Sequence, residues 1–441
     1  METIDLLIDA RWVIPVNPAG RVLEEHSVAV RGGRIVAVLP TPQAHAAYRA
    51  AECVSLPAHA LIPGLVNLHT HASMSLMRGL ADDLPLPQWY EDRIWPTEAK
   101  HLTPQFVYDG TLLACAEMLR GGITCFNDMY FYPAEAARAA LDMGMRAALG
   151  LIVIDAPTAY AADADDYIAK GLVLRDALRE QALLSFCMAP HAPYSVSDRT
   201  FSRVITLAEE LDLPVHMHVH ETRDEIERSL AVHGLRPLER LRRLGLVGPN
   251  LIAVHAIHLT QDEIELLANN GSSVAHCPSS NLQLANGLAP VPEMLAQGVY
   301  VGLGTDGSAS NNRLDLFQEM RTATLIAKIA GADARALPAE RALSMATLDG
   351  ARALRLDHAI GSIEAGKFAD LAAVEFAAPE MLPCYDPIAH IVFVAGRENV
   401  SHTWVAGRLL LENRTLKLRS KNDLENIAVL WQNRLSKKTR A

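Results

Sequence analysis

Three histidines and one aspartate stand at the ends of short apolar runs, where their side chains could bind a metal ion. His69 and His71 follow one run, His218 lies in a second, and Asp306 follows a third. The period of two along a strand points His69 and His71 to the same side. Three imidazoles and a carboxylate suit zinc or a similar divalent ion. Each motif alone has an ordinary structural explanation, so the prediction depends on their combination.

The second run carries more histidines than packing would explain. A period of two places three side chains on one face of this strand: His216, His218 and His220. Neutral imidazoles on a buried face still need hydrogen-bond partners. Glu221 follows just beyond the strand. His255, in a later apolar run, is either a further site residue or a core histidine.

The elements that must position these residues alternate along the middle of the chain. Apolar runs and segments of helical period follow one another from Leu61 to about Leu356. The runs predicted as strands include residues 215–219, 251–256, 273–276 and 299–304. The helices predicted between them are residues 199–211, 237–244, 260–269 and 292–297. This alternation favours a (β/α)8 barrel, in which catalytic groups lie at the C-terminal strand ends. A doubly wound sheet is the alternative, but no glycine-rich dinucleotide loop follows an early strand.

Both ends of the chain have β character. The N-terminal strands are predicted at residues 6–8, 27–30 and 34–38, and the later strands at 369–374, 391–394 and 402–405. The turn Gly32-Gly33 predicts a hairpin. We expect both ends to form one small β-sandwich domain. The predicted boundaries are 1–60 and 361–420 for this domain, 61–360 for the barrel, and 421–441 for a C-terminal tail with a helix at 422–434.

Composition narrows the class of protein. The chain has 441 residues, 50% of them hydrophobic, a net charge of -11 and a pI near 5.9. These values fit a folded protein and argue against nucleic acid or an anionic membrane as partners. Residues 1–15 lack the pattern of a signal peptide, and no apolar run has membrane-spanning length. The six cysteines are scattered, so we expect buried free thiols in a cytoplasmic protein. The protein could form a homo-oligomer.

Several separated motifs, in this order, resemble those of the amidohydrolase superfamily. They are Ile62-Pro63-Gly64, the pair His69 and His71, Gly361-Ser362-Ile363 and Gly366-Lys367-Phe368-Ala369-Asp370-Leu371. Members with two metals use a carboxylated lysine from the fourth strand as a bridging ligand. Between Ala99 and Leu314 the only lysines are Lys100 and Lys170, and Lys170 lies in an acidic helical stretch. The resemblance therefore implies one divalent ion per chain, expected to be zinc.

Such a site could perform hydrolytic deamination of an aromatic ring. A single metal with an open position lowers the pKa of bound water and supplies hydroxide near neutral pH. Glu221 is placed to protonate a ring nitrogen as the adjacent carbon is attacked. His255 and Asp306 could take the proton of the water and pass it to the leaving group. The HxE and PCxxC signature of the zinc deaminases that act on nucleobases is absent, so the chemistry would be convergent.

Closer motifs resemble those of the amidohydrolases that deaminate 5′-methylthioadenosine and S-adenosylhomocysteine to inosine analogues and ammonia. These motifs are residues 69–89, Glu98, Ala189–Tyr194, Pro278–Leu282 and Asp306–Asn312. The resemblance implies that Glu98 binds the ribose hydroxyls, where a carboxylate accepts two hydrogen bonds. It also implies that His191 contacts the purine, Trp89 lines the pocket and Ser310 lies near the metal-bound water.

One feature departs from this resemblance, and two other functions remain open. Members that act on S-adenosylhomocysteine are expected to bind its carboxylate with an arginine near the third strand, but none occurs from Ala147 to Leu174. A triazine or guanine aminohydrolase would use the same metal, yet its substrate has no ribose for Glu98. A catalytically inactive scaffold is the third possibility, although it should have lost metal ligands, and this chain retains them all.

Overall fold

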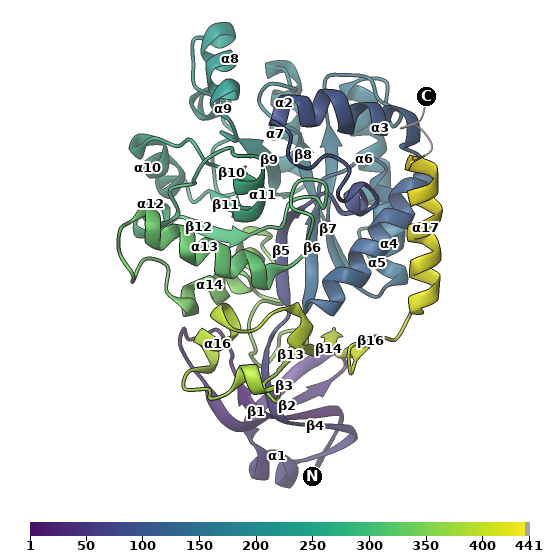
Figure 1. Ribbon diagram of the computed structural model, residues 1–441, viewed down its shortest axis with the longest axis vertical. Coiled ribbons are helices and arrows are strands. Elements are labelled where there is room, and N and C mark those ends of the chain that lie inside the picture. The colour runs from purple at the N-terminus through teal and green to yellow at the C-terminus, as the bar shows by residue number, and fades with distance from the viewer. Residues whose placement is uncertain (437–441) are drawn as a thin grey trace. The chain divides into compact units, whose positions relative to one another are not determined.

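The middle of the chain forms a sheet of eight strands in a computed structural model that describes residues 1–436. The strand order is β12-β11-β10-β9-β8-β7-β6-β5, so each strand lies beside the one that follows it in the sequence. Neighbouring strands run parallel (Figure 1). The strands are β5 (Leu65–Thr70), β6 (Ile123–Asp128), β7 (Arg146–Val153), β8 (Leu184–Pro190), β9 (Val215–Val219), β10 (Leu251–His255), β11 (Ser273–His276) and β12 (Tyr300–Leu303). The predicted (β/α)8 barrel is confirmed.

Backbone contacts join the two ends of this sheet. The amide of Asp306, just after β12, donates to the carbonyl oxygen of His69 in β5 (3.0 Å), and Thr70 Oγ1 donates to the carbonyl oxygen of Asp306 (2.9 Å). Apart from Ser185 and Tyr300, the strand residues are buried on both faces, as parallel strands covered by helices should be. Two of the predicted site residues therefore meet where the barrel closes.

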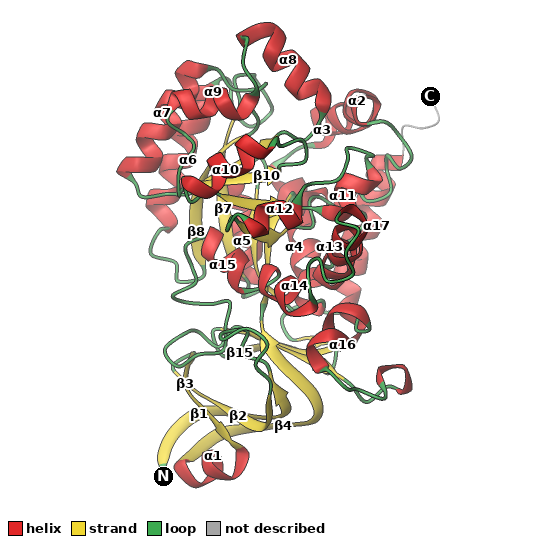
Figure 2. Ribbon diagram, turned by 90° about the vertical axis from the view of Figure 1, so that its left-hand side faces the viewer, coloured by secondary structure: helices red, strands yellow, loops and turns green. Residues whose placement is uncertain are grey.

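Helices follow most of these strands, and several pack on the outside of the barrel (Figure 2). They are η1 (Ala72–Met77), α2 (Leu86–Gln88), η2 (Trp89–Ile94), α3 (Trp95–His101), α4 (Pro104–Arg120), α5 (Pro133–Asp142), α6 (Ala164–Leu178), α7 (Asp198–Glu210), α8 (Arg223–His233), α9 (Pro237–Leu244), α10 (Gln261–Asn269), α11 (Pro278–Gln283) and α12 (Val291–Ala296). A capping box starts α10, with the side chains of Thr260 and Glu263 each accepting from the other's amide. Helices α13 (Leu316–Ala330), α14 (Ala339–Met345) and α15 (Leu348–Ala353) come later in the chain.

The second sheet contains strands from both ends of the chain, as predicted. Its order is β16-β15-β14-β13-β4-β1-β2-β3. The strands are β1 (Glu2–Val13), β2 (Leu23–Arg31), β3 (Arg34–Pro40), β4 (Tyr48–Pro63), β13 (Leu371–Glu375), β14 (Val400–Val405), β15 (Arg408–Glu412) and β16 (Thr415–Leu416), with the short helix α1 (Thr41–Ala47) after β3. Strand β13 pairs antiparallel with β4, so the N- and C-terminal strands meet at the centre of the sheet.

This sheet curls around its own apolar core. The edge strand β3 bonds to the segment before β13, because Ile35 accepts from the amide of Gly366 (2.8 Å) and donates to the carbonyl of Lys367 (2.9 Å). The core contains alternate residues of several strands: Leu6, Ile8, Val28, Val30, Ile35, Leu61, Leu371 and Trp404. At the β2–β3 turn, Gly32 and Gly33 have φ of 56° and 75°, which confirms the predicted hairpin.

One predicted strand is wrong. Residues 391–394 were expected to be β but lie mostly in helix α16 (Pro387–Phe393). Asp386 is the N-cap of this helix, and its side chain accepts from the amides of Ile388 (2.9 Å) and Ala389 (3.2 Å). Pro387 occupies the first helical turn, where the missing amide hydrogen has no consequence. Local capping therefore outweighs the β propensity of this short apolar run.

The chain divides into two compact units. One comprises residues 1–67, 116–125 and 315–418, and the other comprises residues 68–115, 126–314 and 419 onward. The predicted domain boundaries at 60, 360 and 420 stay a prediction. The C-terminal helix α17 spans Lys421–Ser436, and the rest of the predicted tail, 437–441, lies outside the described residues.

The cysteines are free, but Cys53 is exposed and Cys384 half-buried, whereas burial of all six was expected. Within residues 1–436, no helix has the length and apolar character needed to cross a membrane.

Candidate metal centre and substrate cavity

Five predicted side chains converge at the C-terminal end of the barrel strands. One set of ligand atoms, from His69, His71 and Asp306, lies within 4.8 Å of one another, and so does a second set from His69, His218 and His255. Asp306 Oδ1 is 3.3 Å from Nε2 of both His69 and His71. These residues come from β5, β9 and β10 and from the loop after β12. The fold thus brings together residues that are more than 200 positions apart in the sequence.

The backbone leaves its strand conformation where two of these side chains are presented. His255 has φ of 69° and Asp306 has φ of 59°. Side-chain-bearing residues adopt this left-handed region rarely, and such strain clusters at functional sites. The turn at each strand end directs these two side chains toward the other ligand atoms.

Hydrogen bonds at the far side of each imidazole leave Nε2 available. His71 donates from Nδ1 to the carbonyl of Met129 (2.6 Å), and His218 donates from Nδ1 to the carbonyl of His191 (2.9 Å). These bonds fix the tautomer in which Nε2 has a free lone pair, as in metal-binding histidines. The Nε2 atom of His69 is buried and has no hydrogen-bond partner among residues 1–436. A buried nitrogen without a partner fits a site that a metal ion completes.

The charges also suit a cation. Burial alone would raise the pKa of Asp306, but nearby His69 and His71 outweigh this effect and hold it well below its usual value. Ser280 and Ser310 donate to Asp306 Oδ2 (2.6 and 2.8 Å), and the amide of Gly307 donates to Oδ1 (2.7 Å). Burial lowers the pKa of His69 to about 3. The cluster therefore offers neutral imidazoles and one carboxylate, which is the donor set of a zinc site.

Glu221 lies beside this cluster on a rigidly held turn. Its own amide and that of His220 donate to the two carboxylate oxygens of Glu225 (2.9 and 3.0 Å). Its Oε1 accepts from Asn286 Nδ2 (3.1 Å) and is 3.9 Å from His255 Nε2. Burial raises the pKa of Glu221. Burial therefore favours the protonated form, in which this carboxyl group can act as a proton donor.

A cavity of about 720 Å³ opens above the cluster. Its lining includes His71, His218, Glu221, His255, Asp306 and Ser310, and also the other predicted substrate-binding residues: Trp89, Glu98 and His191. None of the described residues that line this cavity is an arginine or a lysine. A neutral, partly apolar ligand therefore suits the cavity better than an anion.

The three residues predicted to bind substrate are held by bonds to the cavity wall. Trp89 Nε1 donates to the carbonyl of Ala309 (3.1 Å), and His191 Nδ1 bonds to Ser195 Oγ (3.0 Å). Glu98 accepts from the hydroxyl of Tyr130. Burial raises the pKa of Glu98 to about 7 although the Tyr130 bond opposes this shift. Glu98 is therefore a half-buried carboxyl group in the same cavity as the metal cluster.

Residues 60–410, about four fifths of the chain, match the amidohydrolase family. This chain belongs to the amidohydrolase family. It is 45% identical over 428 residues to a 5-methylthioadenosine/S-adenosylhomocysteine deaminase of Saccharophagus degradans, covering 97% of this chain and 96% of that protein. A zinc-bound adenosine deaminase from Xanthomonas campestris has 49% identity and a TM-score of 0.98, covering 98% of this chain and 99% of the other. An atrazine chlorohydrolase from Arthrobacter aurescens, complexed with zinc, covers 97% and 99% with a TM-score of 0.90, but its 23% identity shows the fold alone.

Two of the three histidines predicted on one face of β9 lie outside the metal cluster of this amidohydrolase. His216 lies behind it, with Nε2 3.0 Å from Nδ1 of His69. The strand ends at Val219, and His220 has φ of 54°. The His220 ring therefore turns away, and its Nε2 accepts from the amide of Leu238 (3.1 Å). Of the three, only His218 offers a ligand atom to the cluster.

Sequence reasoning assigned no role to several residues that support the site in this amidohydrolase. They are Tyr130, Glu225, Ser280, Asn281 and Asn286. Ser280 and Asn281 lie in a segment noted as a motif, and Asn281 Oδ1 accepts from His255 Nδ1 (2.9 Å). Polar residues directly after a buried strand, here β11, are a signal that could have found both. No comparable signal marks Tyr130 or Asn286, because their contacts join distant parts of the chain.

Proposed function

We propose that this amidohydrolase is a zinc-dependent deaminase of adenosine derivatives, among them 5′-methylthioadenosine, S-adenosylhomocysteine and adenosine. It hydrolyses the bond between the adenine ring and its amino group and releases ammonia and an inosine analogue. The observation that carries the proposal is one cavity that joins the His and Asp cluster, a buried acid at Glu221 and a half-buried carboxyl group at Glu98. The relatives described above support the same activity.

The metal ligands in this proposal are His69, His71, His218 and Asp306. A zinc ion bound there would lower the pKa of a water molecule to near neutrality. One ion per chain is proposed because neither candidate lysine has a place in the cluster. Lys170 donates to the carbonyl of Tyr160 (2.7 Å) and to Asp166 (2.8 Å), and Lys100 lies on α3. Neither of these two lysines is therefore positioned to bridge a second ion.

Proton transfer is assigned to three residues. Protonated Glu221 donates to a ring nitrogen of adenine, and burial favours this protonated form. Because His255 donates from Nδ1 to Asn281, its Nε2 keeps a lone pair on the side of Glu221. His255 and Asp306 can thus accept the proton of the attacking water and return it to the departing amino group. His255 and Asp306 belong to the two groups of ligand atoms that share His69, so both lie beside the proposed metal site.

Substrate recognition is assigned to the cavity wall. Glu98 accepts hydrogen bonds from the ribose hydroxyls, His191 contacts the purine, and Trp89 covers the nucleoside. Ser310 donates to Asp306 Oδ2, so we propose that it orients this carboxylate near the reacting water. Guanine and triazines have no ribose, and for them the half-buried Glu98 carboxylate would have no partner on the substrate. This observation favours a nucleoside over those substrates.

A substrate panel tests the proposed function. The zinc-loaded protein is incubated with adenosine, 5′-methylthioadenosine, S-adenosylhomocysteine, guanine and atrazine. We expect loss of the adenine absorbance and release of one ammonia for the adenosine derivatives, and no reaction with the other two. A protein stripped with a chelator is the matched control. Hydrolysis of guanine or atrazine without turnover of any adenosine derivative would overturn the proposal.

A further inference from the structure

An amino-acid tail on the substrate would need a cation that the metal-containing cavity lacks. The described lining of that cavity contains no arginine or lysine. Two arginines, Arg78 and Arg223, follow cavity-lining residues closely in the sequence, namely Met74 and Glu221. Arg78 donates to the carbonyl of Asn312, and neither arginine lines the cavity. The charge must therefore come from another element.

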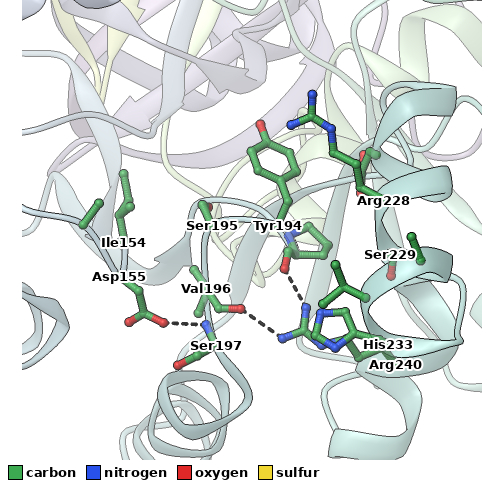
Figure 3. Close-up of a pocket in the computed structure, with 15 residues that line it drawn as sticks. Ile154, Asp155, Tyr194, Ser195, Val196, Ser197, Arg228, Ser229, His233 and Arg240 are labelled. Carbon is green, nitrogen blue, oxygen red and sulfur yellow. Dashed lines mark hydrogen bonds between the residues drawn. The ribbon is translucent and has the colours of Figure 1, made fainter.

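A second cavity, of about 660 Å³, adjoins the first (Figure 3). The two share the lining residues Ile154, Ala156, Tyr194 and Ser195. The other walls of the second cavity are the loops after β7 and β8 and the inner side of α8. The shared residues place the second cavity next to the first, within reach of a long substituent.

Three charged residues of the second cavity are already engaged. Arg240 donates to the carbonyls of Pro193 (2.6 Å) and Val196 (3.0 Å) and pairs with Asp198. Asp155 accepts from the amide of Ser197 (2.5 Å) and from a nearby hydroxyl. The carboxylate of Glu225 binds the two amides of the Glu221 turn. These groups shape the wall and leave little capacity for a ligand.

Arg228 differs from them. Its guanidinium lies beside the ring of Tyr194, one of the residues that line both cavities (Figure 3). It pairs through Nε with Asp224 (2.7 Å), and its two terminal nitrogens have no hydrogen-bond partner among residues 1–436. The side chain is 67% exposed, so a ligand can reach it. Two free guanidinium nitrogens match the two oxygens of a carboxylate.

We propose that the second cavity receives the amino-acid end of a 5′-substituent and that Arg228 binds its carboxylate. This inference rests on the proposed function and extends it to the specificity for the tail. A short, neutral thioether stays within the first cavity and never meets Arg228. An adenosine derivative with an amino-acid tail, such as S-adenosylhomocysteine, spans both cavities. Arg228 would thus determine which charged 5′-substituents the enzyme accepts.

The test compares Arg228→Met with Arg223→Met, which removes the same charge from the same helix at a residue that lines neither cavity. The measured quantity is the ratio of kcat/KM for S-adenosylhomocysteine to kcat/KM for 5′-methylthioadenosine. We expect this ratio to fall about five- to ten-fold in Arg228→Met, as for loss of a partly exposed ion pair. It should stay at the wild-type value in Arg223→Met. An unchanged ratio in Arg228→Met would overturn the proposal.

A substrate analogue and a binding measurement complete the test. The carboxamide of S-adenosylhomocysteine has no negative charge, so its turnover should not respond to Arg228→Met. An equal loss of turnover for the acid and the carboxamide would mean that Arg228 acts by filling space and not through its charge. That result would also overturn the proposal. Titration calorimetry with S-adenosylhomocysteine, done in proteins that also carry Glu221→Gln to suppress turnover, should show a Kd raised about five- to ten-fold by Arg228→Met. Because binding needs no turnover, this result separates failure of the tail site from failure of the deaminase assignment.

Discussion

Replacement of Glu221 by glutamine separates proton transfer from metal binding. Glu221 contributes no ligand atom to the described metal clusters, so the variant should retain its zinc. The amide oxygen of glutamine can still accept from Asn286 Nδ2, which preserves the shape of the cavity. What the variant loses is an acid that can deliver a proton to the ring nitrogen. The structure therefore predicts an effect on kcat with little change in metal content.

The size of the effect follows from the role. A positioned general acid contributes about 10²- to 10⁴-fold to a rate. The lower bound corresponds to about 2.7 kcal/mol in the activation barrier. Burial raises the pKa of Glu221, so the wild-type acid stays protonated to higher pH than an exposed glutamate. The kcat of the wild type should decline as pH rises through this pKa, and Glu221→Gln should lose that dependence.

The assay measures kcat for 5′-methylthioadenosine by loss of the adenine absorbance, together with zinc by mass spectrometry. Glu227→Gln is the matched control, because Glu227 is exposed on α8, the helix that begins two residues after Glu221. It should behave as the wild type. A Glu221→Gln protein with full zinc and a kcat within about three-fold of the wild type would refute the proton-transfer role. The same kcat loss in Glu227→Gln would point to a general disturbance of α8.

Three further results are expected. The wild type should bind about one divalent ion per chain and His71→Ala should lose it, whereas two ions in the wild type would contradict the single-metal site. 5′-Methylthioadenosine should exceed S-adenosylhomocysteine about ten-fold or more in kcat/KM, because the tail finds no buried cation, and equal values would contradict this. Glu98 has a pKa of about 7 and must be ionised to accept both ribose hydroxyls, so KM for adenosine should rise about ten-fold from pH 8 to pH 6. Neither 2′,3′-dideoxyadenosine nor the Glu98→Gln variant should show this rise.

The barrel could be predicted because its signals are local. Buried parallel strands leave continuous apolar runs, and helix starts carry capping residues such as Thr260 with Glu263. The run at 391–394 gave a wrong strand prediction because its β propensity is also a local signal. The deciding signal, Asp386-Pro387, lies four residues earlier and favours a helix. Reading the caps before the apolar run would have given the correct element.

The site could be predicted only in part. The period of two correctly grouped His216 and His218 on one face of the strand. It could not tell which of them reaches the metal cluster, and His216 lies behind His69. It also failed at His220, where the strand had already ended and a positive φ turns the ring away. The support of Glu221 by Asn286 joins segments 65 residues apart, and such pairings depend on the closed barrel. Residue spacing alone does not predict such contacts.

The order of strands in the second sheet has a consequence for synthesis on the ribosome. One edge of strand β4 pairs with β1. Its other edge stays unpaired until β13 has been synthesised, about 300 residues later. At about 5–20 residues per second, this edge stays unpaired for roughly 15–60 s. An open edge strand can bind other chains, so the nascent protein passes through a period of exposure to aggregation that the finished protein does not have. Slower translation between β4 and β13 should therefore lower the yield of folded protein even though no residue changes.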